Sequence, residues 1–266
     1  MTIRQPVQSS AVWKAHDATN PDQWSMRFSG EQQSAIVEAA HRAIENGRTV
    51  ATIKPEDFDI PLLAAQVSEW VETLSNGRGF VLLRGFPIDE LPPDAIALAY
   101  VGLGVLLGTP VGQDADATVL GHVRDEGIPR TGPGVRIYRT KARQNFHTDG
   151  SDIVGLLCLQ KAKAGGESRI ASSYAVYNEI LRRRPDLVDV LYEPMYWDRN
   201  DEQSPGEDPF FSLPVFNDVG GSPRVFFIGW YIRDAQRHPQ VPRLTDRQLE
   251  ALDLIESIAI LSFTSR

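Results

Sequence analysis

Apolar side chains recur at helical spacing in several parts of the chain. Ser29 with Gln32 forms a capping-box pattern, which predicts a helix over 31–45 that ends at Gly47. Apolar residues three and four positions apart predict a second helix over 62–74. Further helices are expected over 95–108, over 175–184 with Ser172 or Ser173 as the cap, from Pro185 onward, and over 245–259 after a Thr245 and Gln248 capping box.

Shorter apolar runs, bounded by glycine, proline and polar residues, predict β-strands. The expected strands lie at residues 79–85, 118–123, 135–140, 153–159, 167–172, 213–216 and 224–230. The last two flank Gly220-Gly221-Ser222, and this arrangement predicts a hairpin.

Composition narrows the class of protein. The chain has 266 residues, of which 42% are hydrophobic and 23% charged, a profile typical of a folded protein with a sizeable core. That length suits one large domain or one domain with an extension. The formal net charge is -8 and there is no basic tract, so a nucleic-acid partner is not expected.

Cysteine content and hydropathy indicate the compartment. Cys158 is the only cysteine, so no internal disulfide can form, and its apolar neighbours predict a buried thiol. The first residues hold no apolar core of signal-peptide length, which favours a reducing, cytoplasmic location. The uncharged run 95–113 is interrupted by Pro110, so a buried helix is expected there rather than a membrane span. Gly102-x-Gly104 lies inside this helical pattern and is not expected to form a dinucleotide loop.

Residues 144–150, with the sequence QNFHTDG, carry the candidate chemistry. In an extended backbone alternate side chains leave on one face, so His147 and Asp149 should point the same way and Thr148 the other way. An imidazole and a carboxylate at this spacing can supply two ligands of the 2-His-1-carboxylate triad of non-haem Fe(II) oxygenases. A His-x-Asp tripeptide also occurs by chance as a turn cap. The tripeptide alone favours that interpretation, and the sequence around it favours the metal site instead.

Several segments together resemble one family. The motif Phe146-His147-Thr148-Asp149-Gly150 is followed by Gly165-Gly166-Glu167-Ser168 and then by the helical run 173–181. Residues 79–86, 231–237 and 244–253 fit the same ordered pattern, which runs from about residue 65 to residue 259. In this order the segments resemble the taurine dioxygenase-like (TauD/TfdA-like) family of Fe(II)/2-oxoglutarate-dependent dioxygenases.

The resemblance implies a fold and a site. The implied fold class is α+β with a mainly β core, a double-stranded β-helix (jelly roll, clavaminate synthase-like) flanked by helices and incomplete at the C-terminus. Residues 61–266 would form the dioxygenase domain, after an N-terminal arm and helix at 1–60. His147 and Asp149 would bind Fe(II), and Ser168 would hydrogen-bond 2-oxoglutarate, although it could equally be a solvated serine at a strand start. The implied chemistry uses O2 to oxidise a small organic substrate, with neither a nucleic-acid nor a membrane partner.

The chain also departs from the family pattern. Members continue into strands that supply a distal histidine and an arginine that binds the cosubstrate carboxylate, whereas no histidine here follows His238. His238 precedes the distal position, and the other histidines, His16, His41 and His122, are expected on surfaces or loops. Arg243, Arg247 and Arg266 are candidate carboxylate partners. The sequence therefore reads as a truncated member, an ending that splicing, a frameshift or a gene-model error would each produce.

Two functional hypotheses follow. The first is an Fe(II)/2-oxoglutarate-dependent dioxygenase, with the activity of this chain in doubt. The second is a non-catalytic member of the family that binds a ligand or partner or has no function of its own. Substrate identity cannot be read from the sequence, because variable loops set it in such enzymes.

Overall fold

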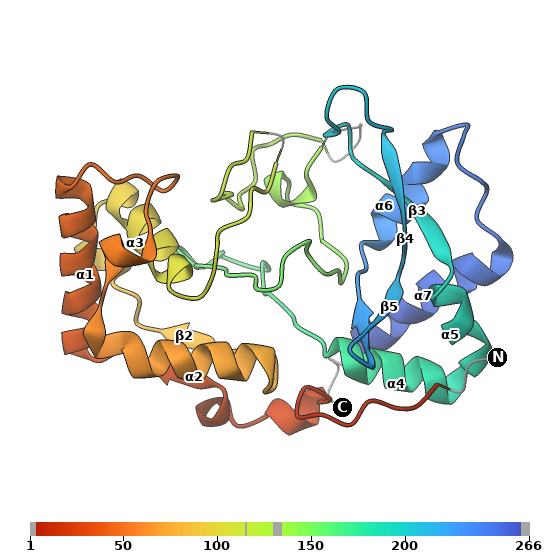
Figure 1. The fold of residues 1–266 in the computed structure, drawn as a ribbon, viewed down its shortest axis with the longest axis horizontal. Coiled ribbons are helices and arrows are strands. Elements are labelled where there is room, and N and C mark those ends of the chain that lie inside the picture. Colours follow the sequence, from red (N-terminus) through yellow and green to blue (C-terminus); the bar gives the residue numbers. More distant parts are fainter. Residues whose placement is uncertain (1–3, 115, 130–134, 262–266) are drawn as a thin grey trace. The chain divides into compact units, whose positions relative to one another are not determined.

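The computed structural model describes residues 4–114, 116–129 and 135–261 (Figure 1). Its contacts divide the chain into two compact units. The N-terminal unit comprises Ala18–Gly121 and Ile153–Glu167, and the C-terminal unit comprises Met1–Asp17, His122–Asp152 and Ser168–Arg266. The boundary at residue 60 expected from the sequence falls inside the N-terminal unit and stays a prediction.

The described residues of the N-terminal unit form three α-helices: α1 (Gly30–Glu45), α2 (Ala64–Ser75) and α3 (Pro93–Val105). The strands β1 (Ser25–Arg27) and β2 (Leu82–Arg84) pair in parallel. Short 3-10 turns precede and connect these elements: η2 (Pro21–Gln23), η3 (Pro55–Phe58), η4 (Pro61–Leu63) and η5 (Ile88–Glu90). A further 3-10 turn, η1 (Ala15–Ala18), falls where the chain passes from the C-terminal to the N-terminal unit. The predicted capping box is confirmed, since the Ser29 hydroxyl accepts from Gln32 N and the Gln32 side chain accepts from Ser29 N.

Close packing against Phe58 explains a glycine in α3. A Cβ atom added at Gly102 would lie 2.4 Å from Phe58 Cδ2, a distance at which atoms overlap. Phe58 is fully buried, and nearby Phe28 packs edge-on against Trp70 with ring centroids 6.0 Å apart. Gly102 is therefore a packing glycine inside a helix, as the sequence indicated, and not part of a dinucleotide loop.

The C-terminal unit combines helices with two antiparallel strand pairs. Its helices are α4 (Ser173–Arg183), α5 (Pro185–Leu191), α6 (Gly229–Asp234) and α7 (Asp246–Leu261), with 3-10 turns η6 (Ile137–Arg139) and η7 (Ala235–Arg237). Strand β3 (Pro194–Asp198) pairs with β4 (Phe210–Pro214), and β5 (Phe216–Val219) pairs with β6 (Ser222–Val225). Figure 1 shows α4, α5 and α7 packed together beside these strands. The fully buried Trp197 of β3 anchors the core.

Local signals for the elements of this unit are confirmed. The Ser172 hydroxyl caps α4 by accepting from Ala175 N, and Pro185 begins a new helix. Thr245 and Gln248 exchange the hydrogen bonds of a capping box ahead of α7. Gly220 and Gly221 both have positive φ in the turn between β5 and β6, so the predicted hairpin forms. Its strands lie closer to the turn than expected, at 216–219 in place of 213–216 and at 222–225 in place of 224–230.

The expected strands at 118–123, 135–140, 153–159 and 167–172 do not form. The described residues contain mixed helix and strand, as expected, but their strands make three two-stranded sheets and no closed barrel. A β-strand requires a neighbouring strand to complete its backbone hydrogen bonds. In the described residues these pairings are β1 with β2, β3 with β4 and β5 with β6, and none of them includes the four expected segments.

Without a sheet over it, the run 153–159 stays largely open to solvent. Leu156 is 70% exposed and Leu159 is 52% exposed. Cys158 is also exposed, so the prediction of a buried thiol is wrong. The run 95–113 forms α3 and then leaves the helix, and within the described ranges no helix is long and apolar enough to cross a bilayer.

Candidate metal centre

Thr148 links the His-Thr-Asp tripeptide to Phe227, just before α6, through two hydrogen bonds. Thr148 N donates to Phe227 O at 2.8 Å, and Phe227 N donates to the Thr148 hydroxyl oxygen, also at 2.8 Å. The tripeptide lies in an irregular segment, so the expectation of a strand end is wrong. The structure nevertheless places His147 and Asp149 on either side of an anchored residue.

His147 and Asp149 approach each other. His147 Nε2 lies 3.8 Å from Asp149 Oδ1, and the two side chains are 24% and 52% exposed. His147 Nδ1 lies 2.8 Å from Asn145 O. Because a carbonyl oxygen only accepts hydrogen bonds, Nδ1 carries a proton, and in the neutral imidazole Nε2 then keeps its lone pair on the side of the carboxylate.

This donor set fits two ligands of a divalent cation. Two atoms that each lie about 2.1 Å from one cation are at most about 4.2 Å apart, and the observed separation of 3.8 Å satisfies that limit. Metal-binding histidines commonly donate their second ring N–H to a carbonyl or carboxylate, as His147 does to Asn145. That these residues bind iron stays a prediction.

Trp230 completes the surroundings of His147. Its ring packs edge-on against the imidazole with centroids 5.0 Å apart, and it comes from α6. Sequence reasoning missed Trp230 because an aromatic residue inside an apolar run reads only as core.

Ser168 is exposed and lies in the irregular segment before α4. Among the described residues it forms no hydrogen bond with His147 or Asp149. Its assignment to the cosubstrate therefore stays a prediction.

His238 belongs to a separate polar cluster around the buried carboxylate of Asp198. His238 Nε2 lies 2.9 Å from Asp198 Oδ2, which also accepts from Arg237 Nε at 2.6 Å. Burial raises the pKa of Asp198, but the hydrogen bonds from Arg237 and from Asn200 N outweigh it and the pKa is lowered. Within the described ranges no three His, Cys, Asp or Glu side chains gather to hold a metal, so His238 does not join His147 and Asp149.

The remaining predicted residues lie elsewhere. His16, His41 and His122 are exposed, as expected. Arg243 donates to Gln236 O, and Arg247 Nη2 donates to Asp186 O at 2.9 Å. Arg266 lies outside the described residues.

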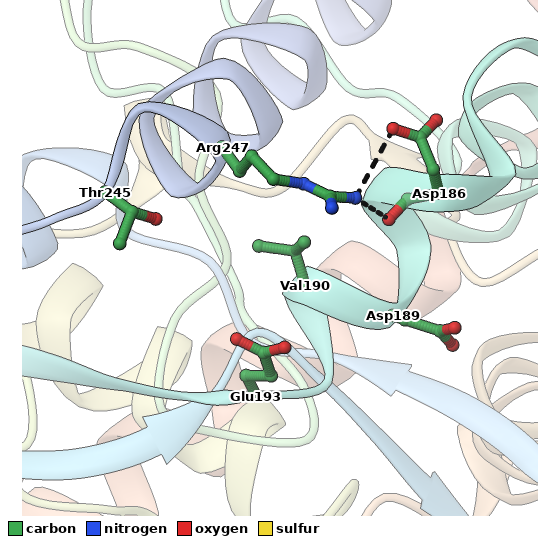
Figure 2. Close-up of a pocket in the computed structure, with 6 residues that line it drawn as sticks. All are labelled: Asp186, Asp189, Val190, Glu193, Thr245 and Arg247. Carbon is green, nitrogen blue, oxygen red and sulfur yellow. Dashed lines mark hydrogen bonds and ion pairs between the residues drawn. The ribbon is translucent and has the colours of Figure 1, made fainter. Parts of the chain in front are cut away.

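Among the described residues, each of the two compact units contains a cavity. One, of about 430 Å³, lies where α5 meets the start of α7; Arg247 reaches Asp186 across its rim, as Figure 2 shows. The other, of about 480 Å³, belongs to the N-terminal unit and is lined by residues 53–55 and 105–110. Neither of these two cavities is lined by His147 or Asp149, and the concave pocket expected at the pair stays a prediction.

Comparisons with known proteins identify the family of the chain. The model of the taurine catabolism dioxygenase TauD, TfdA family matches residues 44–262, a range that contains His147, Asp149 and Ser168. FR-33289 synthase of Streptomyces rubellomurinus is 31% identical over 97% of this chain and 76% of its own length. A taurine hydroxylase-like protein of Stachybotrys chartarum is 28% identical over 95% of this chain and 67% of its own length. The chain belongs to the TauD/TfdA family of dioxygenases.

Proposed function

We propose that this protein is an Fe(II)- and 2-oxoglutarate-dependent dioxygenase that oxidises a small organic molecule. Family membership supports this class of reaction. The observation that carries the proposal within the chain is the pairing of His147 Nε2 with the Asp149 carboxylate, at 3.8 Å. The names of the relatives, a synthase and a taurine hydroxylase-like protein, support a small-molecule substrate.

The chain's own residues would prepare the site. His147 and Asp149 would hold Fe(II), which when bound supplies the activation of O2 coupled to 2-oxoglutarate decarboxylation. Asn145 O fixes the tautomer that leaves Nε2 available. Trp230 covers one edge of the imidazole and limits the water and the orientations open to it. The Ser168 hydroxyl would bind a 2-oxoglutarate carboxylate.

We also propose the family's double-stranded β-helix as the fold of the active form, within a dioxygenase domain over 61–266 that follows an arm and helix at 1–60. The family match supports this, because it includes the apolar runs 135–140 and 153–159 that the sequence predicts as strands. A reducing cytoplasm suits the proposal, since the iron must stay in the Fe(II) state to react with O2.

A non-catalytic member of the family is the alternative function. The observation that favours it is the engagement of His238 by Asp198, which leaves His147 and Asp149 as a pair within the described ranges. Two protein ligands bind a metal more weakly and orient it less than three do. Such a chain would retain weak metal binding without efficient turnover.

Anaerobic titration separates these two functions. The purified chain receives Fe(II) and then 2-oxoglutarate while the visible charge-transfer band of the complex is followed, and O2 is then admitted and succinate measured. Catalytic succinate formation that is lost in H147A and D149A establishes the dioxygenase. Iron binding without succinate formation establishes the non-catalytic alternative. Unchanged iron binding in H147A or D149A contradicts the assignment of the pair.

A further inference from the structure

We propose that Thr148 is a positioning residue, which through its two hydrogen bonds to Phe227 holds His147 and Asp149 in the orientation that binds a metal. This inference rests on the proposed function, since it concerns the same two ligands. In this role Thr148 is not itself a metal ligand. It acts on the backbone that carries both ligand side chains.

The hydrogen bonds of Thr148 are of an unusual kind. Its backbone N–H and its side-chain hydroxyl both bond to the main chain of Phe227, each at 2.8 Å. In an ordinary ladder two backbones would make these bonds, whereas here the hydroxyl oxygen takes the place of a backbone carbonyl. The side chain of Thr148 is thereby turned toward Phe227, while its neighbours His147 and Asp149 lie 3.8 Å apart from each other.

Phe227 is well suited as the fixed partner. It is 3% exposed within the hydrophobic core of the C-terminal unit, so its backbone is held by packing. The chain then enters α6 at Gly229, and Trp230 packs against His147. Thr148 therefore sets the register between the His-Thr-Asp tripeptide and the aromatic ring that covers its histidine.

Threonine supplies what other residues at this position would lack. Valine has nearly the same shape and the same β-branching, but it cannot accept the Phe227 N–H. Serine keeps the acceptor and loses one methyl group. Comparison of T148V with T148S therefore isolates the hydroxyl.

Thr245 offers a matched control. Its hydroxyl also accepts a backbone N–H, from Gln248 at 3.2 Å, and it lies in the same unit at the start of α7. T245V removes the same kind of bond away from His147. Any loss of metal binding that follows from general destabilisation should appear equally in T245V.

The experiment measures Fe(II) affinity anaerobically by calorimetry for the wild type, T148V, T148S and T245V, with thermal unfolding recorded for each. We expect the affinity to fall about tenfold or more in T148V, in line with losses of 10–100-fold for residues that orient ligands. T148S and T245V should bind like the wild type. Equal affinity in T148V, an equal loss in T245V, or failure of T148S to restore binding would each overturn the inference.

A second measurement does not depend on the metal. In the metal-free proteins at alkaline pH, the imidazole ¹⁵N chemical shifts of His147 report which ring nitrogen carries the proton. The wild type and T148S should show the Nδ1–H form alone, and T148V a mixture. If the wild type shows the single form and T148V the mixture but the wild type fails to bind iron, the proposed function is refuted, and what stays supported is only that Thr148 orients the imidazole of His147. Identical shifts in T148V and the wild type would refute the positioning role.

Discussion

Asp198 is the last residue of β3, and it is only 2% exposed. It accepts hydrogen bonds from Arg237 Nε at 2.6 Å, Arg237 Nη2 at 3.1 Å, His238 Nε2 at 2.9 Å and Asn200 N at 2.6 Å. The substitution D198N keeps one oxygen, Oδ1, for Asn200 N. It replaces Oδ2 by an amide NH2 that faces two further donors.

The loss of stability in D198N follows from the hydrogen bonds that the substitution removes. Arg237 Nε and His238 Nε2 both donate to Oδ2, and a hydrogen bond to a charged group contributes about 1.5–3 kcal/mol. The Arg237 side chain is 34% exposed, so water compensates part of its loss and the lower value applies. We expect D198N to lower the free energy of unfolding by about 3 kcal/mol, within the range for breaking a buried ion pair.

An exposed carboxylate provides the control. Asp186 accepts two hydrogen bonds from Arg184, at 2.9 and 2.8 Å, in the same bidentate arrangement, but its side chain is 47% exposed. D186N should therefore lower the free energy of unfolding far less than D198N does. Urea unfolding followed by fluorescence gives both free energies, and hydrogen exchange at β3 amides assigns the change to this unit. A loss in D198N below about 1 kcal/mol, or one equal to that in D186N, would refute the reasoning.

The same carboxylate predicts a dependence on pH. The pKa of Asp198 is lowered in the folded protein, so its ionised form stabilises the fold above the unfolded value of about 3.9. That contribution is lost as the pH falls through the folded pKa. The difference in stability between wild type and D198N should therefore narrow below about pH 3.9. A difference that stays constant into the acid range would show that charge is not its cause.

Three further predictions concern the packing of α3, the exposure of Cys158 and the attachment of the N-terminal segment to α4. G102A should destabilise the N-terminal unit by about 1–3 kcal/mol because the added methyl overlaps the buried Phe58 ring, whereas G104A, which has open space around it, should be neutral or stabilising in thermal unfolding. Native Cys158 should react with a thiol reagent at the rate of a free thiol, and reaction only after denaturation would show the thiol to be buried. N178L should raise hydrogen exchange in residues 5–12, because the Asn178 side-chain amide hydrogen-bonds to the backbone N–H and C=O of Val7. Unchanged exchange would show that these two hydrogen bonds do not hold the N-terminal segment.

Much of the local structure could be predicted because its causes are local. The Ser29 and Gln32 capping box, the Ser172 cap and the glycines of the β5–β6 turn each act within a few residues, so each could be recognised directly. The spacing of His147 and Asp149 was equally readable, since two residues separated by one are necessarily close. The ordered motifs also placed the chain in its family before any contact was known.

The remaining features depended on contacts between residues that are far apart in the sequence. Whether runs such as 135–140 and 153–159 become strands depends on a neighbouring ladder, and Cys158 is exposed because none covers it. No pattern near Thr148 indicated its bonds to Phe227 or the approach of Trp230 to His147. The sequence by itself determined the capped helices, the hairpin turn and the proximity of His147 to Asp149. Only the tertiary structure decided what holds that pair in place, because a long-range contact depends on how the whole core packs and not on the residues beside it.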